Sequence, residues 1–505
     1  MKLYYSGHRY VFACEQSLLV LFPEERPEYP ETRDTENAAY ISLSEGNRWA
    51  TAVTRLYRDG RGCLGTARIE RCRLTDGPVR DRLLQRILRL SFYRAARRHT
   101  GRDLPWGALT GVRPGKLALR YLESGLDRPG TAAALERDFF VSPERAALCA
   151  EAGAHSLAVK GSLRPEDVCL YVGIPFCPTR CAYCSFVSVG VEKSAERIEP
   201  YLAALRREIA ATGEIVRRLG LRPVALYIGG GTPTTLSAEQ LSELMSALRE
   251  AFDLSALREY TVEAGRPDTV TAEKLGVLRE NGCGRVSVNP QTMSDGVLRA
   301  IGRRHTAEET VNAYRLARDA GFCSVNMDLI AGLPSDTREG FRETLSKVIK
   351  LDPENVTVHT LSLKKGTRIT VEGTALPGEE TVSGMLEDAE KALKNAGYRP
   401  YYLYRQKYIS GGFENVGWCR PGTESLYNVC IMEELCTVLA MGAGGSTKLV
   451  NPRRGFIERL TEKKYPREFI DTADEAVLRR KEIEAFYARE RILDPAGPEN
   501  QEETI

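Results

Sequence analysis

Three closely spaced cysteines are the residues of this chain best suited to chemistry. They stand in the run Cys177-Pro-Thr-Arg-Cys181-Ala-Tyr-Cys184, which has the spacing C-x3-C-x2-C. Because thiolates are the usual protein ligands of iron–sulfur clusters, one loop with three of them can hold three irons of a 4Fe-4S cube. The fourth iron then lacks a protein ligand and can chelate a small molecule. Three unrelated thiols and a zinc site are the alternatives, but zinc prefers four ligands and no second C-x2-C pair is present.

Further polar residues stand at the ends of β-rich runs, where they could bind a ligand. The second run ends in Gly229-Gly-Gly-Thr-Pro233, whose missing side chains let a ligand approach the backbone closely. The third run ends with Glu263, the fourth with Gln291, and the fifth carries Asp328. These groups can hydrogen-bond ribose hydroxyls or an ammonium group, or each could simply cap the next helix. Arg303 can clamp a carboxylate through its guanidinium fork, and a solvated helix-end arginine is the alternative.

The elements that must position these residues alternate between strands and helices. Six strand-like runs are each followed by a helical stretch, which implies a parallel sheet with right-handed crossovers. Two of the helices open with capping boxes, Ser237-x-x-Gln240 and Thr306-x-x-Glu309. The pattern predicts an α/β fold, a partial (β/α)6 barrel with its chemistry at the carboxyl ends of the strands. The six runs are residues 168–174, 223–228, 260–263, 285–289, 324–330 and 355–361.

The regions on either side of this alternating pattern differ in character. Residues 1–160 are expected to form an α+β domain with short aromatic strands and a basic helix, 80–102, whose apolar stripe is typical of core packing. The polar segment 160–167 predicts a linker to the barrel, which spans 161–398. Residues 399–505 are rich in tyrosine at first and are predicted to be mostly helical, ending in a polar tail.

The composition limits the classes of partner. The 71 basic and 68 acidic residues leave a net charge of +3, too small to indicate binding to nucleic acid or to a membrane surface. No apolar run approaches the length of a membrane span, and the start lacks the apolar stretch of a signal peptide. The 13 cysteines are scattered and odd in number, so they do not indicate a disulfide framework. We therefore expect a cytoplasmic protein, and a reducing compartment also suits an oxygen-sensitive cluster.

The histidines and the other cysteines carry a weaker signal. No histidine has the i, i+4 partner that is typical of a helical metal pair. His359 lies on the sixth run and could point into the barrel, but a core histidine is the simpler interpretation. Cys419, Cys430 and Cys436 show no cluster spacing, so we interpret them as buried or incidental thiols.

Taken in order, the motifs resemble a known family. The cysteine loop, with Tyr183 before its third cysteine, resembles the radical S-adenosylmethionine (SAM) superfamily. The whole series is similar to the oxygen-independent coproporphyrinogen III oxidase family, and the runs 105–114 and 401–418 resemble its HemZ-type branch. The series comprises the cysteine loop, Gly229-Gly-Gly-Thr-Pro-Thr, Val288-Asn-Pro-Gln291, Ile301-Gly-Arg-Arg-His305, Asp328-Leu-Ile-Ala-Gly-Leu-Pro334 and Leu361-Ser-Leu-Lys-Lys-Gly-Thr367.

This resemblance implies two cofactors, a 4Fe-4S cluster on Cys177, Cys181 and Cys184, and SAM. In the implied reaction the reduced cluster splits SAM into methionine and a 5'-deoxyadenosyl radical. The radical takes a hydrogen atom from a propionate, after which carbon dioxide leaves and a vinyl group remains. The residues implied to bind SAM are Tyr171, Tyr183, Gly230, Gly231, Thr232, Glu263, Gln291, Arg303 and Asp328.

The resemblance also implies the partners, a tetrapyrrole substrate and a reducing electron donor such as flavodoxin or ferredoxin. Conversion of two propionates would turn coproporphyrinogen III into protoporphyrinogen IX. The run Cys184-Ser185-Phe186 departs from the Cys-Gly-Cys of the best-understood branch and is shared with haem chaperones. A haem-binding chaperone without turnover is therefore the alternative function. Residues that could contact the macrocycle, or form an exposed edge strand instead, are Tyr401, Tyr402, Tyr404, Arg405 and Lys407.

Overall fold

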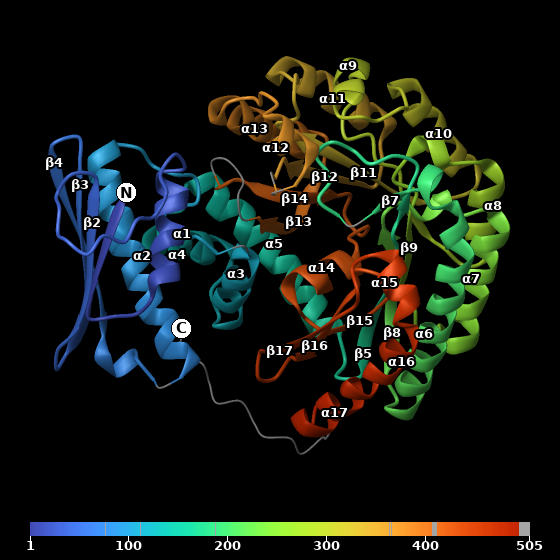
Figure 1. The fold of residues 1–505 in the computed structure, drawn as a ribbon, viewed down its shortest axis with the longest axis horizontal. Coiled ribbons are helices and arrows are strands. Elements are labelled where there is room, and N and C mark those ends of the chain that lie inside the picture. The colour runs from blue at the N-terminus through green and yellow to red at the C-terminus, as the bar shows by residue number, and fades with distance from the viewer. Residues whose placement is uncertain are drawn as a thin grey trace. The chain divides into compact units, whose positions relative to one another are not determined.

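The computed structural model describes residues 1–75, 77–111, 113–186, 188–362, 364, 366–406 and 412–493. These residues form two compact units (Figure 1). One unit holds Met1–Ala154 and the short segment that contains Arg405 and Phe413. The other holds His155–Tyr404 and the described residues from Glu414 to 493. Lys407 of the tyrosine-rich run and the polar tail of the sequence lie outside the described residues.

The N-terminal unit is built on a four-stranded sheet against which helix α2 packs. Strand β1 is parallel to β2, whereas β2, β3 and β4 pair antiparallel. Leu84, Ile87 and Leu88 of α2 are buried in the core of this unit, so the predicted apolar stripe is confirmed as core packing. The elements are β1 (Lys2–Ser6), α1 (Val11–Leu21), β2 (Ala38–Glu45), β3 (Trp49–Arg58), β4 (Arg61–Glu70), α2 (Pro78–Thr100), α3 (Pro114–Glu123), α4 (Arg128–Phe139) and the first part of α5 (Pro143–Ser162).

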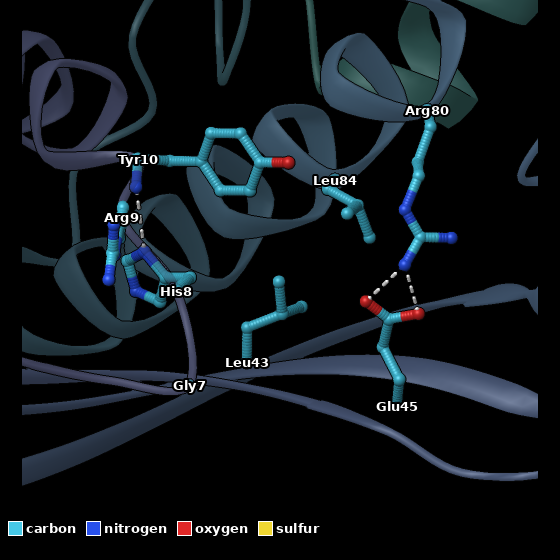
Figure 2. Close-up of a pocket in the computed structure, with 8 residues that line it drawn as sticks. All are labelled: Gly7, His8, Arg9, Tyr10, Leu43, Glu45, Arg80 and Leu84. Atoms are coloured by element: carbon cyan, nitrogen blue, oxygen red, sulfur yellow. Dashed lines mark hydrogen bonds and ion pairs between the residues drawn. The ribbon is translucent and has the colours of Figure 1, made fainter. Parts of the chain in front are cut away.

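A surface pocket of about 300 Å³ opens in this N-terminal unit (Figure 2). One Nη atom of Arg80 donates to both carboxylate oxygens of Glu45, at 2.6 and 2.5 Å. This ion pair balances the charge of that side of the pocket wall. The pocket is lined by Gly7, His8, Arg9, Tyr10, Leu43, Glu45, Arg80 and Leu84, and none of them is a predicted cofactor-binding residue.

The second unit contains an eleven-stranded sheet with the order β13-β14-β12-β11-β10-β9-β8-β5-β15-β16-β17. In its middle, six strands lie side by side in chain order and are all parallel. This pairing confirms the six predicted strands, while the closure of the sheet into a partial barrel stays a prediction. The six strands are β5 (Asp167–Ile174), β8 (Arg222–Gly230), β9 (Glu259–Glu263), β10 (Arg285–Ser287), β11 (Ser324–Ala331) and β12 (Asn355–Thr360).

Helices connect these strands, as the alternating pattern predicts. Helices α6, α7 and α8 cover one face of the sheet, and α14 lies on the opposite face (Figure 1). Both capping boxes are confirmed, because Ser237 and Gln240 satisfy each other's backbone amides, as do Thr306 and Glu309. The helices are α6 (Ile198–Arg218), α7 (Ala238–Ala251), α8 (Ala272–Glu280), α9 (Asp295–Ala300), α10 (Ala307–Asp319), α11 (Arg338–Leu351), α12 (Arg368–Glu372), α13 (Glu379–Asn395), α14 (Leu426–Glu433), α15 (Pro466–Asp471), α16 (Ala473–Arg479) and α17 (Lys481–Glu490).

The C-terminal region corrects the prediction of a mostly helical segment, because its described part also contains five strands. They are β13 (Arg399–Arg405), β14 (Glu414–Cys419), β15 (Thr437–Met441), β16 (Ser446–Asn451) and β17 (Phe456–Thr461). Strand β15 pairs in parallel with β5, and β16 and β17 extend the same sheet. The residue pattern of these short segments does not distinguish a strand from a helix, because β15 is stabilised by pairing with β5, which lies far earlier in the chain.

The predicted linker is also shorter than expected. Helix α5 continues to Ser162 and β5 begins at Asp167, so residues 160–162 of the proposed linker are helical. Gly161 belongs to the last turn of α5, where a glycine is tolerated near a helix end. Among the described helices, none is both long and apolar enough to cross a bilayer.

Candidate functional site

The predicted cluster loop runs between two short paired strands, β6 (Phe176–Cys177) and β7 (Val189–Gly190). Its backbone is held from two directions, because the amide of Ala182 donates to Ile301 O at 2.9 Å and the amide of Thr232 donates to Phe176 O at 2.7 Å. The three cysteines are free thiols and are partly exposed. The loop therefore presents three unpaired sulfur donors on a fixed backbone, as a cluster site requires.

Two thiols of this loop, those of Cys177 and Cys184, need a cation to become thiolates. Burial raises the pKa of Cys177, and burial raises the pKa of Cys184 to about 11. Both are therefore protonated at neutral pH unless a metal displaces the proton. The hydroxyl of Thr232 donates to the Sγ of Cys177 at 3.5 Å, which places this predicted SAM-binding residue directly against the loop.

Arg266 is a loop contact that the sequence interpretation missed. Its guanidinium is almost fully buried and forms a two-pronged ion pair with Asp268, with both N–O distances at 3.0 Å. The same group donates to Thr179 O at 3.2 Å and to the Sγ of Cys181 at 3.8 Å. Arg266 therefore ties the segment after β9 to the cysteine loop. Its only signal in the sequence was its position three residues after Glu263.

The glycine run after β8 packs so closely that side chains are excluded. A Cβ atom at Gly229 would lie 2.9 Å from the Cδ of Glu263, and one at Gly231 would lie 2.5 Å from Phe176 O. Gly230 has a φ of 108°, which L side chains rarely adopt. The run therefore lets the ends of β5, β8 and β9 approach one another closely, while the approach of a ligand to these glycines stays a prediction.

The carboxylate of Glu263 lies against a stack of tyrosine rings. The hydroxyl of Tyr227 donates to Glu263 Oε1 at 2.7 Å. The ring of Tyr227 stacks on Tyr427 of α14 with centroids 4.5 Å apart, and the ring of Tyr171 lies 6.3 Å from each of them. Burial raises the pKa of Glu263 to about 7 even though the Tyr227 hydroxyl lowers it. Glu263 is not the cap of the next helix, because Thr271 caps α8.

The pKa of Glu263 predicts a pH dependence of folding. The pKa of Glu263 in the folded protein is about 7, whereas its ordinary value is 4.5. Between pH 4.5 and pH 7 the folded protein therefore keeps a proton on Glu263 that the unfolded chain has lost. The free energy of unfolding contributed by this group is therefore highest at low pH and falls as the pH rises through 7.

We expect Glu263→Gln to remove this dependence. Between about pH 5 and pH 8, the parent should lose on the order of 2 kcal/mol of unfolding free energy relative to the variant, since one pKa unit corresponds to about 1.4 kcal/mol. Urea unfolding of the cofactor-free proteins at both pH values measures the difference. Parallel pH profiles of the two proteins would show that Glu263 ionises normally.

Asp328 on β11 lies beside His359 on β12. The Nε2 of His359 is 3.7 Å from Asp328 Oδ2, and the side-chain Nδ2 of Asn326 donates to Asp328 Oδ1 at 2.8 Å. Burial acts to raise the pKa of Asp328, but His359 and Asn326 outweigh it and the pKa is lowered. The carboxylate is therefore ionised at neutral pH. His359 is half-buried, and its two ring nitrogens face Asp328 and the hydroxyl of Tyr404, so it has polar partners as a satisfied core histidine does.

Gln291 is held in place through its backbone. Its amide donates to Asp328 O at 2.9 Å, and its carbonyl accepts from the amide of Ile330 at 3.0 Å. Its φ of 67° is left-handed, an uncommon conformation for a residue other than glycine. Such strain is often retained where a side chain must be aimed at a site.

Arg303 is buried, so the alternative of a solvated helix-end arginine is wrong. Its Nη1 donates to Asn289 O at 2.7 Å and its Nη2 donates to the Tyr183 hydroxyl at 3.3 Å. Among the described residues no carboxylate forms an ion pair with it, and its Nε has no hydrogen-bond partner. Burial also lowers the pKa of neighbouring His305 to about 3, which keeps that ring neutral. A buried cation with an unused donor suits the carboxylate of a bound ligand.

The tyrosine-rich run does not line an open pocket. Strand β13 is at the edge of the sheet, as one alternative predicted, but Tyr401 and Tyr402 are buried rather than exposed. Arg405 is buried as well. It donates to the carbonyls of Leu109 and Gly412, and its guanidinium lies 5.4 Å from the ring centroid of Trp106. Because Tyr401, Tyr402 and Arg405 are buried against other residues of the chain, they do not support the prediction of a tetrapyrrole pocket formed by this run.

Several of the predicted residues contact one another at the carboxyl ends of neighbouring strands. The contacts join Thr232 to Cys177, Tyr183 to Arg303, and the backbone of Gln291 to that of Asp328. In the described part of the chain, no hydrogen bond or ion pair joins Arg303 to Glu263 or Asp328. The donor set, three thiols with a buried guanidinium and two carboxylates, fits a cluster together with an amino-acid ligand.

Comparisons with known proteins identify the family of the chain. Residues 171–348 match the Radical SAM superfamily. The chain is 43% identical over 376 residues to the oxygen-independent coproporphyrinogen-III oxidase-like protein HemZ of Bacillus subtilis. The aligned region covers 74% of this chain and 75% of HemZ. It is 31% identical over 308 residues to the Heme chaperone HemW of the same organism, covering 59% of this chain and 76% of HemW.

A solved structure is also similar. Coproporphyrinogen III oxidase (HemN) from Escherichia coli, described as a radical SAM enzyme, matches with a TM-score of 0.52 and 25% sequence identity. The match covers 64% of this chain and 73% of HemN. Radical SAM proteins use a 4Fe-4S cluster and SAM, the two cofactors that the donor set fits. The chain belongs to the oxygen-independent coproporphyrinogen III oxidase-like family of radical SAM proteins.

Proposed function

We propose that this protein is a radical SAM oxidoreductase that converts two propionates of coproporphyrinogen III to vinyl groups without oxygen, forming protoporphyrinogen IX in porphyrin synthesis. The observation that carries the radical SAM part is the buried Arg303, without a carboxylate partner among the described residues, in contact with Tyr183 of the cysteine loop. The substrate part rests on the likeness to HemZ and HemN across most of the chain. A reducing donor such as flavodoxin or ferredoxin, in the cytoplasm, completes the proposal.

The proposal gives each group of residues a role. Cys177, Cys181 and Cys184 would hold the cluster, and Arg266 would fix the Cys181 sulfur through its hydrogen bond. When bound, the cluster and SAM supply the one-electron and hydrogen-abstraction chemistry, which protein side chains cannot perform.

The remaining residues would position SAM. Arg303 would form a fork with the SAM carboxylate, since its Nε still has a proton to donate. Glu263 would accept hydrogen bonds from the SAM ammonium group, and contact with that cation would lower the pKa of Glu263 from about 7. The ionised Asp328 would accept a hydrogen bond from a ribose hydroxyl. Together these contacts would fix SAM against the end of β9, against β11 and against the segment after α9.

A haem chaperone is the second candidate, and the residue that favours it is Phe186. The run Cys184-Ser185-Phe186 carries a phenylalanine side chain that is 69% exposed, directly beside the cluster loop. An exposed aromatic ring can stack on a flat macrocycle. The identity to HemW supports the same reading.

We expect the anaerobically reconstituted, reduced protein to form 5'-deoxyadenosine as coproporphyrinogen disappears. Carbon dioxide should be released, and a tripropionate intermediate should precede protoporphyrinogen. Liquid chromatography with mass detection follows all of these species in one sample. Because Cys181→Ala removes a proposed cluster ligand, it is the matched negative control.

The two candidates predict opposite outcomes for haem. An enzyme should consume coproporphyrinogen whether or not haem is added. Tight haem binding by protein that leaves coproporphyrinogen unchanged with every reductant would replace the enzyme proposal by the chaperone. In that case Phe186→Ala should weaken haem binding, whereas it should leave the cluster intact.

A further inference from the structure

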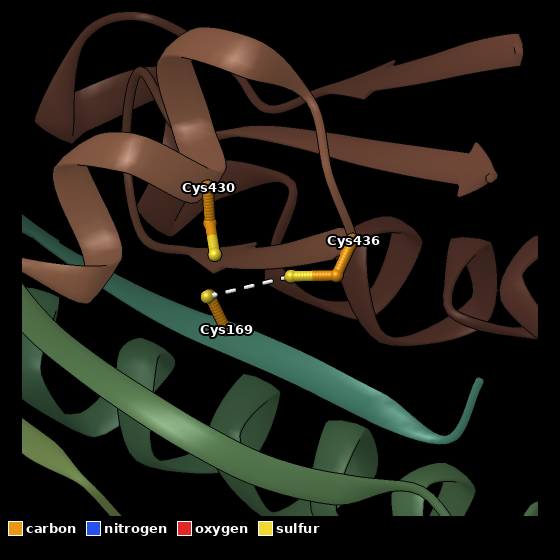
Figure 3. A group of neighbouring side chains, drawn as sticks. All are labelled: Cys169, Cys430 and Cys436. Carbon is orange, nitrogen blue, oxygen red and sulfur yellow. Dashed lines mark hydrogen bonds between the residues drawn. The ribbon is translucent and has the colours of Figure 1, made fainter. Parts of the chain in front are cut away.

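A second group of cysteines lies apart from the cluster loop. Cys169, Cys430 and Cys436 place their Sγ atoms within 4.8 Å of one another, and the sulfurs of Cys169 and Cys436 are 3.6 Å apart. All three are free and buried. Figure 3 shows the three sulfur atoms turned toward one shared point. The interpretation of Cys430 and Cys436 as buried thiols is therefore confirmed, but they are not isolated ones.

The backbone, rather than flexible side chains, brings these sulfurs together. Cys169 is on β5, in register with Val438 of β15. Cys436 directly precedes β15 and lies two residues before Val438, so its side chain is on the same face of the sheet as that of Cys169. Cys430 is on α14, and the left-handed residue Glu434, with a φ of 55°, ends that helix. The amide of Leu435 then donates to Cys430 O at 3.2 Å, which turns the chain back so that Cys436 returns toward α14.

The other end of α14 is also fixed to the sheet. The carboxylate of Glu259 on β9 accepts from the Ser425 hydroxyl at 2.9 Å and from the Leu426 amide at 2.6 Å. This carboxylate at a helix N-terminus is favourable for the helix as well as for its attachment. Helix α14 is therefore held at both ends, and Cys430 has little freedom to move away from the other two sulfurs.

Neither simple packing nor a disulfide accounts for three converging sulfurs. A buried cysteine can pack singly as a small apolar side chain, as Cys283 does, donating to Arg285 O at 3.1 Å. A disulfide joins two sulfurs at about 2.0 Å and leaves the third without a role. Among the described residues no histidine or carboxylate belongs to this group. An all-sulfur site selects soft cations over magnesium, calcium or manganese.

We propose that Cys169, Cys430 and Cys436 bind a single thiophilic d10 cation, copper(I) or zinc(II), at a site separate from the cluster loop. Binding exchanges the three thiol protons for the cation and forms three metal–sulfur bonds, with no change of oxidation state. The resulting net charge is −2 with copper(I) and −1 with zinc(II). Three thiolates satisfy copper(I), whereas zinc(II) requires one additional ligand.

The position of this site gives the cation a structural consequence. Cys430 lies three residues after Tyr427 on α14, and Tyr427 stacks on Tyr227, which donates to Glu263. A cation that joins α14 to β5 and β15 would hold this ring stack behind the Glu263 carboxylate. Because a ligand that binds only the folded state stabilises it, the cation should also raise the Tm.

The test uses the full chain in which Cys177, Cys181 and Cys184 are replaced by serine, so that the cluster loop cannot bind the added metal. The reduced protein is titrated anaerobically with copper(I) or zinc(II) against a chromophoric chelator, and bound metal is counted by mass spectrometry. We expect one of the two titrations, or both, to end at a single bound cation per chain. The titration that reaches this stoichiometry identifies the ion. Adding Cys436→Ser should weaken binding by about 100-fold or more, since loss of an outer-shell partner alone costs about 10- to 100-fold and here a direct ligand is lost.

Adding Cys283→Ser is the matched control, since Cys283 is equally buried but isolated, and metal binding should be unchanged. Should the Cys436 variant fail to fold, cadmium titration of the starting protein gives an independent measure, because the ultraviolet thiolate-to-cadmium absorbance reports the number of bound thiolates. A cadmium absorbance that corresponds to three bound thiolates per chain supports the proposal. Absence of binding for both ions while the three thiols are free, or recovery of a Cys169–Cys436 disulfide by peptide mapping of the anaerobic protein, overturns it.

Discussion

Replacing Cys181 by alanine is expected to abolish the iron–sulfur cluster. Three thiolates on one loop are the proposed protein ligands, so anaerobically reconstituted parent protein should contain about four irons. The variant should lose the visible charge-transfer absorbance and nearly all of this iron, and Cys177→Ala and Cys184→Ala should do the same. Iron analysis together with the absorption spectrum measures the effect.

Cys283→Ala provides the matched control for this experiment. Its thiol is fully buried and donates only to backbone carbonyls in the described structure, so its loss should leave iron and absorbance unchanged. Equal loss of iron from the Cys181 and Cys283 variants would mean that the loop is not the cluster site. Because the loop backbone is held by Ile301 O and by the Thr232 amide, removal of one sulfur should not unfold the protein.

Arg303→Lys is expected to weaken SAM binding by about 10- to 100-fold, because lysine keeps the charge but cannot form the two parallel hydrogen bonds of a guanidinium fork. Lysine can still donate to Asn289 O, which Arg303 contacts at 2.7 Å, so the buried carbonyl is not left without a donor. The iron content should stay at the parent value. Equilibrium dialysis of SAM against the anaerobic protein measures the affinity.

Arg304→Lys is the control for Arg303, since it tests the same substitution one residue away. Arg304 is exposed and pairs with Glu192 at 2.8 Å, a surface ion pair that contributes little. Its replacement should leave SAM affinity unchanged. If both variants bind SAM as tightly as the parent does, Arg303 does not contact SAM and only supports the loop through its hydrogen bond to Tyr183.

Features whose signals are local can be predicted from the sequence. The spacing of Cys177, Cys181 and Cys184 places three thiols on one loop whatever surrounds it. The capping boxes at Ser237 and Thr306 depend on side chains three residues apart, and both are present. The six parallel strands follow from short β-rich runs separated by helices, because chain connectivity restricts how such units can pair. Membership of the family follows from these same local motifs.

Contacts between residues far apart in the sequence become visible in the folded protein alone. Arg266 reaches the Sγ of Cys181 and Tyr227 reaches Glu263 across neighbouring strand ends, and neither contact has a fixed spacing along the chain. Strand β15 forms because β5 offers a free edge far earlier in the sequence, and this pairing brings Cys436 to Cys169, 267 positions away. Such contacts depend on sheet register and on the turn after α14. Their energy comes from burial and pairing between segments, which a pattern within one segment does not encode.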